Sequence, residues 1–138
     1  MIDQIVTEIK ILKQVSLETT KKEVKDLNLH ERLRAANKTA WTQGCGLAAI
    51  QIGVPLRFAW LVCDGYEETL LNPVIISRSG QITIDEGCLS LPKVWFTKPR
   101  SEHIEYISHG KKKKASGFKA RIIQHEIDHM NGVLVNGF

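Results

Sequence analysis

The chain has 138 residues, of which 43% are hydrophobic and 25% charged, a composition that fits a globular domain and excludes a disordered chain. This length suffices for one domain with its own core but not for two of ordinary size, so we expect a single domain over residues 1–138. No apolar run is long enough to cross a membrane, and the N-terminus mixes charged with apolar residues. We therefore expect a cytoplasmic protein that has no signal peptide and does not enter membranes.

The excess of positive charge comes from one short segment. The net charge is +4, and four of the 19 basic residues form an unbroken lysine run at residues 111–114. The other 15 basic residues equal the 15 acidic ones in number, so the rest of the chain is close to neutral. We interpret the run as a solvated turn rather than as a phosphate-binding patch.

The first third of the chain has a helical pattern. Apolar residues recur at helical steps from residue 17 to about residue 41, and Ser16 is a suitable N-cap. The spacing predicts a helix over residues 16–41, ended by Gly44 and Gly46.

The middle of the chain changes to extended patterns. An apolar run at residues 58–62, closed by Asp-Gly, predicts a strand and a turn. Further strands are expected at residues 70–77 and 81–84. The alternating residues 104–108 predict the first arm of a hairpin, with the lysine run and the two residues after it at the far end.

The helical pattern returns after Gly117. Apolar residues at helical spacing predict a helix over residues 118–130, ended by Asn-Gly. The order of helix, strands and helix indicates an α+β fold.

The last predicted helix carries the strongest chemical signal, His125-Glu126-Ile127-Asp128-His129. Residues four apart lie on one face of a helix, so both imidazoles can bind one metal ion. The glutamate between them then lies beside the open position of the metal, where it can take a proton from a bound water. Two unrelated histidines on a surface helix are the alternative.

A catalytic site of this kind needs a third protein ligand, and it must come from upstream. Only nine residues (138 − 129) follow His129, and position 135, where the extended metalloprotease pattern has a third histidine, is valine. The upstream candidates are the cysteines, the other histidines and many carboxylates. Cys88 stands out because it lies between a glycine and a nearby proline, in the segment EGCLSLP. Core packing is the alternative for Cys88, and it is the interpretation that we favour for Cys63.

A glycine-rich segment at residues 44–51, GCGLAAIQ, suits a backbone that lies against a ligand. Gln51 at its end offers an uncharged amide donor for a developing oxyanion. Glycines that simply end a helix are the alternative interpretation.

Together and in this order, the segments GCGLAAIQ, EGCLS and QHEIDHMNG resemble the three signatures of peptide deformylase. The resemblance covers roughly residues 30–135. It implies antiparallel or mixed β-sheets around a central helix that carries the HExxH motif, with an additional N-terminal helix. It also implies metal-dependent hydrolysis of the formyl group of N-terminal formyl-methionine on nascent polypeptides.

The resemblance assigns the catalytic roles position by position. Cys88, His125 and His129 would bind one divalent ion, most often Fe²⁺ in this family, with Zn²⁺, Ni²⁺ or Co²⁺ as substitutes. Glu126 would be the general base. Gln51 and the backbone N–H of Leu89 would stabilise the oxyanion.

The resemblance also implies how substrate binds. Backbone groups of Cys45, Gly46 and Gly87 would pair with an extended peptide, and an apolar pocket near Ile84, Phe118 and Ile122 would take the methionine side chain. Gln124 would support the first histidine. Glu86 and Arg100 would pair to hold the cysteine strand.

The chain departs from the family in three places. Its N-terminus lacks the usual proline-containing opening, and the hairpin before the last helix is short. The long C-terminal helix of many bacterial members has no counterpart after residue 138, as in virus-encoded members. We therefore expect a monomer that does not dock to the ribosome through such a helix.

Two other functions compete with deformylation. A peptidase of the two-histidine zinc type would use the same motif, but its downstream ligand is missing. A basic module that binds RNA or the ribosome would use the lysine run, but it would have no need of Glu126 and Gln51.

Overall fold

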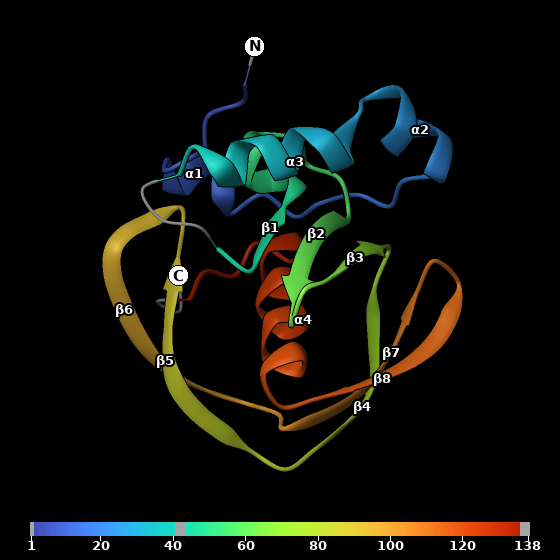
Figure 1. Ribbon diagram of the computed structural model, residues 1–138, viewed down its shortest axis with the longest axis vertical. Helices are drawn as coiled ribbons and strands as arrows, with labels where there is room; N and C mark the ends of the chain where they lie inside the picture. The colour runs from blue at the N-terminus through green and yellow to red at the C-terminus, as the bar shows by residue number, and fades with distance from the viewer. Residues whose placement is uncertain (1, 41–43, 136–138) are drawn as a thin grey trace.

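The fold is built around its last helix, α4 (Gly117–Met130), in a computed structural model that describes residues 2–40 and 44–135 (Figure 1). Within the strands, the side chains of residues 84, 93 and 94 lie outside the described part. The helix predicted over residues 118–130 is confirmed. Its buried apolar side chains are those of Ala120, Ile122, Ile123, Ile127 and Met130.

Three antiparallel sheets surround α4. One has the order β1-β2-β3, with β1 (Gly46–Ala48), β2 (Phe58–Cys63) and β3 (Tyr66–Leu71). The second has the order β4-β7-β8, with β4 (Val74–Ser79), β7 (His103–Ser108) and β8 (Lys111–Ser116). The third pairs β5 (Ile82–Cys88) with β6 (Leu91–Arg100). This arrangement confirms the α+β fold with sheets around a central helix.

The prediction of one helix over residues 16–41 is wrong in its details. The described N-terminal part forms three short helices, α1 (Ile9–Leu12), α2 (Lys21–Asp26) and α3 (Leu29–Lys38), and residues 41–43 lie outside the described part. Ser16 is not an N-cap, because its N–H donates to the carbonyl oxygen of Met130. The side chain of Thr20 caps α2 instead, and Asn28, at φ 53°, separates α2 from α3. The spacing of apolar residues cannot reveal the cap at Thr20 or the left-handed backbone at Asn28, so it predicts one continuous helix.

Two strand predictions also need correction. The strand predicted over residues 70–77 is divided at Asn72, whose φ of 49° and following Pro73 end β3 before β4 begins. We expected Pro92 to end the cysteine strand soon after Cys88, but β6 contains it. Trp95 of β6 pairs with Gly87 and Leu91 pairs with Cys88, and the pairing between these two points is irregular. Pro92 lies in this irregular stretch, so its missing N–H removes no regular hydrogen bond between the strands.

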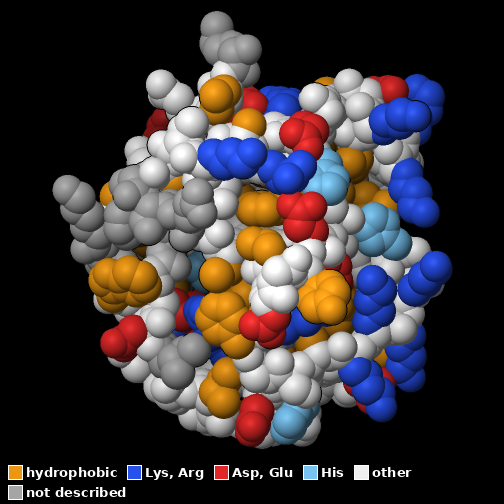
Figure 2. Space-filling view, in the orientation of Figure 1, with side chains coloured by type: hydrophobic (Ala, Val, Ile, Leu, Met, Phe, Trp, Pro, Cys, Tyr) orange, Lys and Arg blue, Asp and Glu red, His pale blue; other side chains and the backbone are white. Residues whose placement is uncertain are grey.

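The lysine run is a strand and not a turn. It forms most of β8, which pairs with β7 in the predicted hairpin, and the turn lies at His109 and Gly110. Because β8 is an edge strand of its sheet, its lysines also disfavour pairing with another chain. Figure 2 shows Lys and Arg side chains gathered along the side of the molecule formed by α2 and the β7–β8 hairpin.

Two apolar clusters form the core. One lies between α4 and the sheets and contains Tyr106, whose hydroxyl donates to Glu68 Oε2 at 2.7 Å. The other lies beneath α3 and contains Leu29, Leu33 and Phe58. The segment at residues 47–50 contributes to both clusters, so the glycine-rich motif is fixed from two sides.

Gly132, just after α4, packs closely against the backbone that follows α1. Its φ is 75°, and a Cβ there would collide with the backbone oxygen of Lys13. Gly110 has a similar φ of 73° but no atom near such a Cβ. We expect Gly110→Ala to lower the free energy of unfolding by about 1 kcal/mol, and Gly132→Ala to lower it by at least twice that. Urea unfolding of both variants measures the difference, and equal losses would contradict the close packing of these two segments.

Candidate metal centre and its pocket

Cys88, His125 and His129 come together as a group that could hold a metal ion, with one ligand atom of each within 4.8 Å of the others. The two histidines lie one turn apart on α4, and their Nε2 atoms are 3.2 Å from each other. Cys88, at the end of β5, places its Sγ 3.4 Å from Nε2 of His129. One thiol and two imidazoles fit a divalent transition metal rather than a hard cation such as Mg²⁺.

Glu86 orients the first histidine from behind. Its Oε1 lies 3.0 Å from Nδ1 of His125, so the hydrogen bond turns Nε2 toward the cluster. Arg100 donates two hydrogen bonds of 2.8 Å to the same carboxylate, which confirms the expected Glu86–Arg100 pair. Burial would raise the pKa of Glu86, but the hydrogen bonds from Arg100 and His125 lower it to about 2. The carboxylate is therefore charged at neutral pH.

The two histidines differ in how they hold a proton. Burial keeps the pKa of His129 well below its usual range, so this ring is neutral. Burial also opposes protonation of His125, but its hydrogen bonds to Cys88 and Glu86 raise its pKa to about 10. A cation that binds Nε2 of His125 must therefore displace a proton.

Glu126 lies beside the cluster in a dry position. It is 3% exposed, and its Oε1 has no hydrogen-bond partner among the described residues. Its Oε2 lies against Gly46, where a Cβ would be only 2.6 Å away, so a side chain at position 46 would displace the carboxylate. Burial raises the pKa of Glu126 to about 7, despite the opposing charges of His125 and Arg100. A carboxyl group with this pKa can both accept and return a proton at neutral pH.

The amide of Gln51 is fixed by two neighbours. Gln51 lies in a 3₁₀ turn (Ala49–Ile52), and its Oε1 accepts a hydrogen bond of 3.0 Å from the N–H of Ala48. Its Nε2 donates to Oγ of Ser90 at 3.1 Å and lies 3.6 Å from Sγ of Cys88. The NH₂ group thus faces the cysteine side of the centre.

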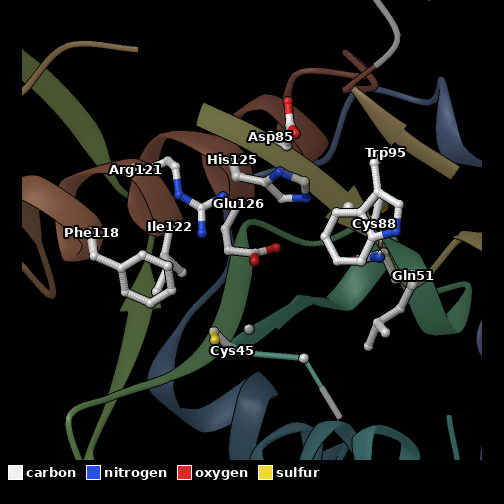
Figure 3. A pocket seen from close by; sticks show the side chains of 14 residues that line it. Cys45, Gln51, Asp85, Cys88, Trp95, Phe118, Arg121, Ile122, His125 and Glu126 are labelled. Atoms are coloured by element: carbon white, nitrogen blue, oxygen red, sulfur yellow. Dashed lines mark hydrogen bonds between the residues drawn. The ribbon is translucent and has the colours of Figure 1, made fainter. Parts of the chain in front are cut away.

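A cavity of about 300 Å³ opens beside these groups (Figure 3). Most of the predicted site residues line it: Cys45, Gly46, Gln51, Gly87, Cys88, Leu89, Phe118, Ile122, His125 and Glu126. Ile84 belongs to β5 opposite Lys98, and its side chain lies outside the described part. Gln124 does not reach the ligands: its amide donates to the backbone oxygen of Ser101 and accepts from the N–H of the same residue.

Sequence reasoning missed three residues that line the cavity, Asp85, Trp95 and Arg121. Arg121 precedes His125 by one helical turn, so helix spacing could have identified it. Trp95 carried no such signal, because only the pairing of β5 with β6 brings it against Gly87.

The sequence and the fold both match known proteins. A family model described as polypeptide deformylase matches residues 2–136. The chain belongs to the polypeptide deformylase family.

Individual members show the same likeness. A peptide deformylase of Rickettsia prowazekii is 40% identical over 108 residues, which make up 67% of this chain and 62% of the relative. The crystal structure of peptide deformylase from Thermotoga maritima has a TM-score of 0.89 at 28% identity and covers 99% of this chain and 96% of its own. The expected likeness to virus-encoded members is confirmed by a probable peptide deformylase from Synechococcus phage S-SSM7, with a TM-score of 0.87, 31% identity and 99% of each chain covered. Among the described residues of this deformylase-family chain, no helix is both long and apolar enough to span a membrane.

Cobalt binding tests the metal centre independently of activity. We expect Co²⁺ to give a cobalt–thiolate absorption band in the protein and in Cys63→Ser, which alters a cysteine outside the cluster. Cys88→Ser should lose the band, and Glu86→Gln should weaken Co²⁺ binding about 10–100-fold because His125 loses its orienting partner. A band that persists in Cys88→Ser would contradict the ligand set.

Proposed function

We propose that this protein removes the formyl group from the N-terminal formyl-methionine of nascent polypeptides and releases formate. The observation that carries the proposal is the buried Glu126, which lines the same cavity as Cys88 and His125 and whose Oε1 has no partner in the described part of the chain. Membership of the polypeptide deformylase family supports the same reaction. A peptidase could use such a centre too, but the family favours deformylation.

The resident cofactor that we propose is one Fe²⁺ ion, held by Cys88, His125 and His129, with Zn²⁺, Ni²⁺ or Co²⁺ as substitutes. The mixture of thiolate and imidazole donors supports a metal of this class. When bound, such an ion acidifies a water molecule and polarises a carbonyl oxygen. Cys88 as a thiolate ligand also makes the centre sensitive to oxygen and peroxide.

Glu126 moves the proton. It takes a proton from the attacking water and later delivers it to the amine that leaves from the formyl carbon. Its place beside the cluster, with Oε1 free of partners among the described residues, fits both steps. Gln51 Nε2 and the N–H of Leu89 stabilise the negative charge that develops on the formyl oxygen.

Two free strand edges receive the substrate backbone. Among the described residues, β1 is the edge strand of its sheet, and β5 pairs only with β6. Cys45, Gly46 and Gly87 at these edges line the cavity, which supports addition of an extended peptide between them. Phe118 and Ile122 form apolar walls for the methionine side chain, and the assignment of Ile84 to this pocket stays a prediction.

The cellular setting follows from the substrate. Nascent formylated chains place the reaction in the cytoplasm, of a bacterium or of the host of a virus. A monomer that does not dock to the ribosome through a C-terminal helix stays a prediction.

Formate release tests the reaction and the general base together. Protein loaded with Fe²⁺ under anaerobic conditions, or with Ni²⁺, should release formate from a formyl-Met-Ala peptide. We expect Glu126→Gln to lower kcat at least 10²-fold, because general-base catalysis contributes about that much. Glu102→Gln, at a carboxylate on the surface, is the matched control and should keep full activity. Metal-loaded, folded protein that releases no formate would refute the proposal and favour the RNA-binding or peptidase function.

Replacing Gln51 separates stabilisation of the oxyanion from binding of the substrate. Gln51→Ala should lower kcat about 10²-fold and leave KM nearly unchanged, because the amide acts on charge that develops in the transition state. Ser90→Ala removes only one partner of the amide and should have a much smaller effect. A change confined to KM in Gln51→Ala would instead assign this side chain to ground-state binding.

A further inference from the structure

An arginine, Arg121, lines the pocket that the family resemblance assigns to the methionine side chain of the substrate. Arg121 lies on α4 between Phe118 and Ile122, and its side chain is only 14% exposed. Its guanidinium carbon lies 4.6 Å from the centre of the Phe118 ring. Figure 3 shows Arg121 extending into the cavity on the side of Phe118 and Ile122, away from Trp95 and Gln51.

The guanidinium of Arg121 has few hydrogen-bond partners among the described residues. Its nearest carboxylate oxygen among the described residues, Oε2 of Glu86, is 3.9 Å from Nη1, which is too far for a hydrogen bond. That oxygen already accepts a bond of 2.8 Å from Arg100. Nε of Arg121 is buried and has no partner in the described part of the chain. A guanidinium has five N–H donors, and those on Nη1 and Nη2 remain for an acceptor in the cavity.

The residues around Arg121 indicate which ligand group could accept hydrogen bonds from its guanidinium. Phe118 and Ile122 are apolar, so a ligand side chain that passes them needs an apolar stem. The guanidinium beside them can bond an acceptor carried by that stem. Methionine has both features, because its unbranched chain carries a thioether sulfur that accepts weak hydrogen bonds. Methionine sulfoxide, the oxidised form, carries a polar oxygen at the same place.

We propose that Arg121 is a specificity-determining residue, which selects a first side chain that carries a hydrogen-bond acceptor near its end. The pocket then prefers methionine to norleucine, its isostere without sulfur, and it also accepts methionine sulfoxide. This inference rests on the proposed function, because it concerns the first residue of a formylated peptide.

Three peptides that differ only at this acceptor provide the test: formyl-Met-Ala, formyl-norleucyl-Ala and formyl-Met-sulfoxide-Ala. We expect the unaltered protein to have a KM about five-fold lower for the methionine peptide than for the norleucine peptide, as one weak hydrogen bond allows. Arg121→Met keeps an unbranched side chain over Phe118 but removes the donors. It should abolish this preference and raise the KM for the sulfoxide peptide at least ten-fold.

Two further variants separate recognition from structure. Lys119→Met removes a cation from the same helix outside the cavity and should leave the preference unchanged. Arg121→Gln retains an amide donor and should give an intermediate preference; it also serves if Arg121→Met does not fold. A methionine-to-norleucine ratio that is the same with and without Arg121 would show that this arginine has only a structural role.

Binding measurements keep this inference separate from the proposed reaction. Calorimetric titration of the same peptides into the metal-loaded Glu126→Gln variant reports affinity without turnover. Selective binding that depends on Arg121, without formate release by the unaltered protein, would support the inference and refute the reaction. Formate release together with equal affinities for all three peptides would support the reaction and refute the inference about Arg121.

Discussion

The charged carboxylate of Glu86 has no exposed surface, and the rest of the centre depends on how it is stabilised. An unpaired buried charge would destabilise the fold by several kcal/mol. Arg100 from β6 and His125 from α4 supply the partners, and Arg100 also donates to Asp128 on α4. One ion cluster therefore joins the β5–β6 hairpin to the central helix. Because Cys88 is two residues beyond Glu86 on the same strand, the cluster also holds the thiol beside His129.

A second set of contacts positions the glycine-rich segment at residues 44–51 beside the metal centre. Gln51 is fixed by the N–H of Ala48 and donates to Ser90, which follows the cysteine strand. Gly46, at the start of the same segment, has no side chain and so leaves room for the carboxylate of Glu126. Three segments far apart in the chain thus meet at the cavity, and each contributes both a reactive group and a group that positions a neighbour.

The sequence predicted the parts of this arrangement that depend on local pattern. Helix α4 and the β7–β8 hairpin have clear periodicity and turn residues, and the site residues fall within three short motifs. The helix predicted over residues 16–41 merges α2 and α3, because the left-handed Asn28 between them leaves the apolar spacing unchanged. Trp95 and the full extent of β6 depend on pairing with β5, which is a tertiary property. The resemblance implies an apolar pocket at Phe118 and Ile122, and it does not include the arginine between them.

The groups that remain unsatisfied are concentrated at the site. Four buried side-chain polar atoms lack a partner in the described part of the chain, and three of them belong to Arg121, Glu126 and His129. The free edges of β1 and β5 face the same cavity. Elsewhere, buried polar groups such as Gln124 are bonded, in that case to both backbone groups of Ser101. The buried polar atoms that lack a partner among the described residues thus belong mostly to the metal centre and its pocket. The proposed ligand, an extended peptide with a scissile carbonyl at one end and an acceptor in its first side chain, would fit the two strand edges, the carboxylate of Glu126 and the guanidinium of Arg121 that line this cavity.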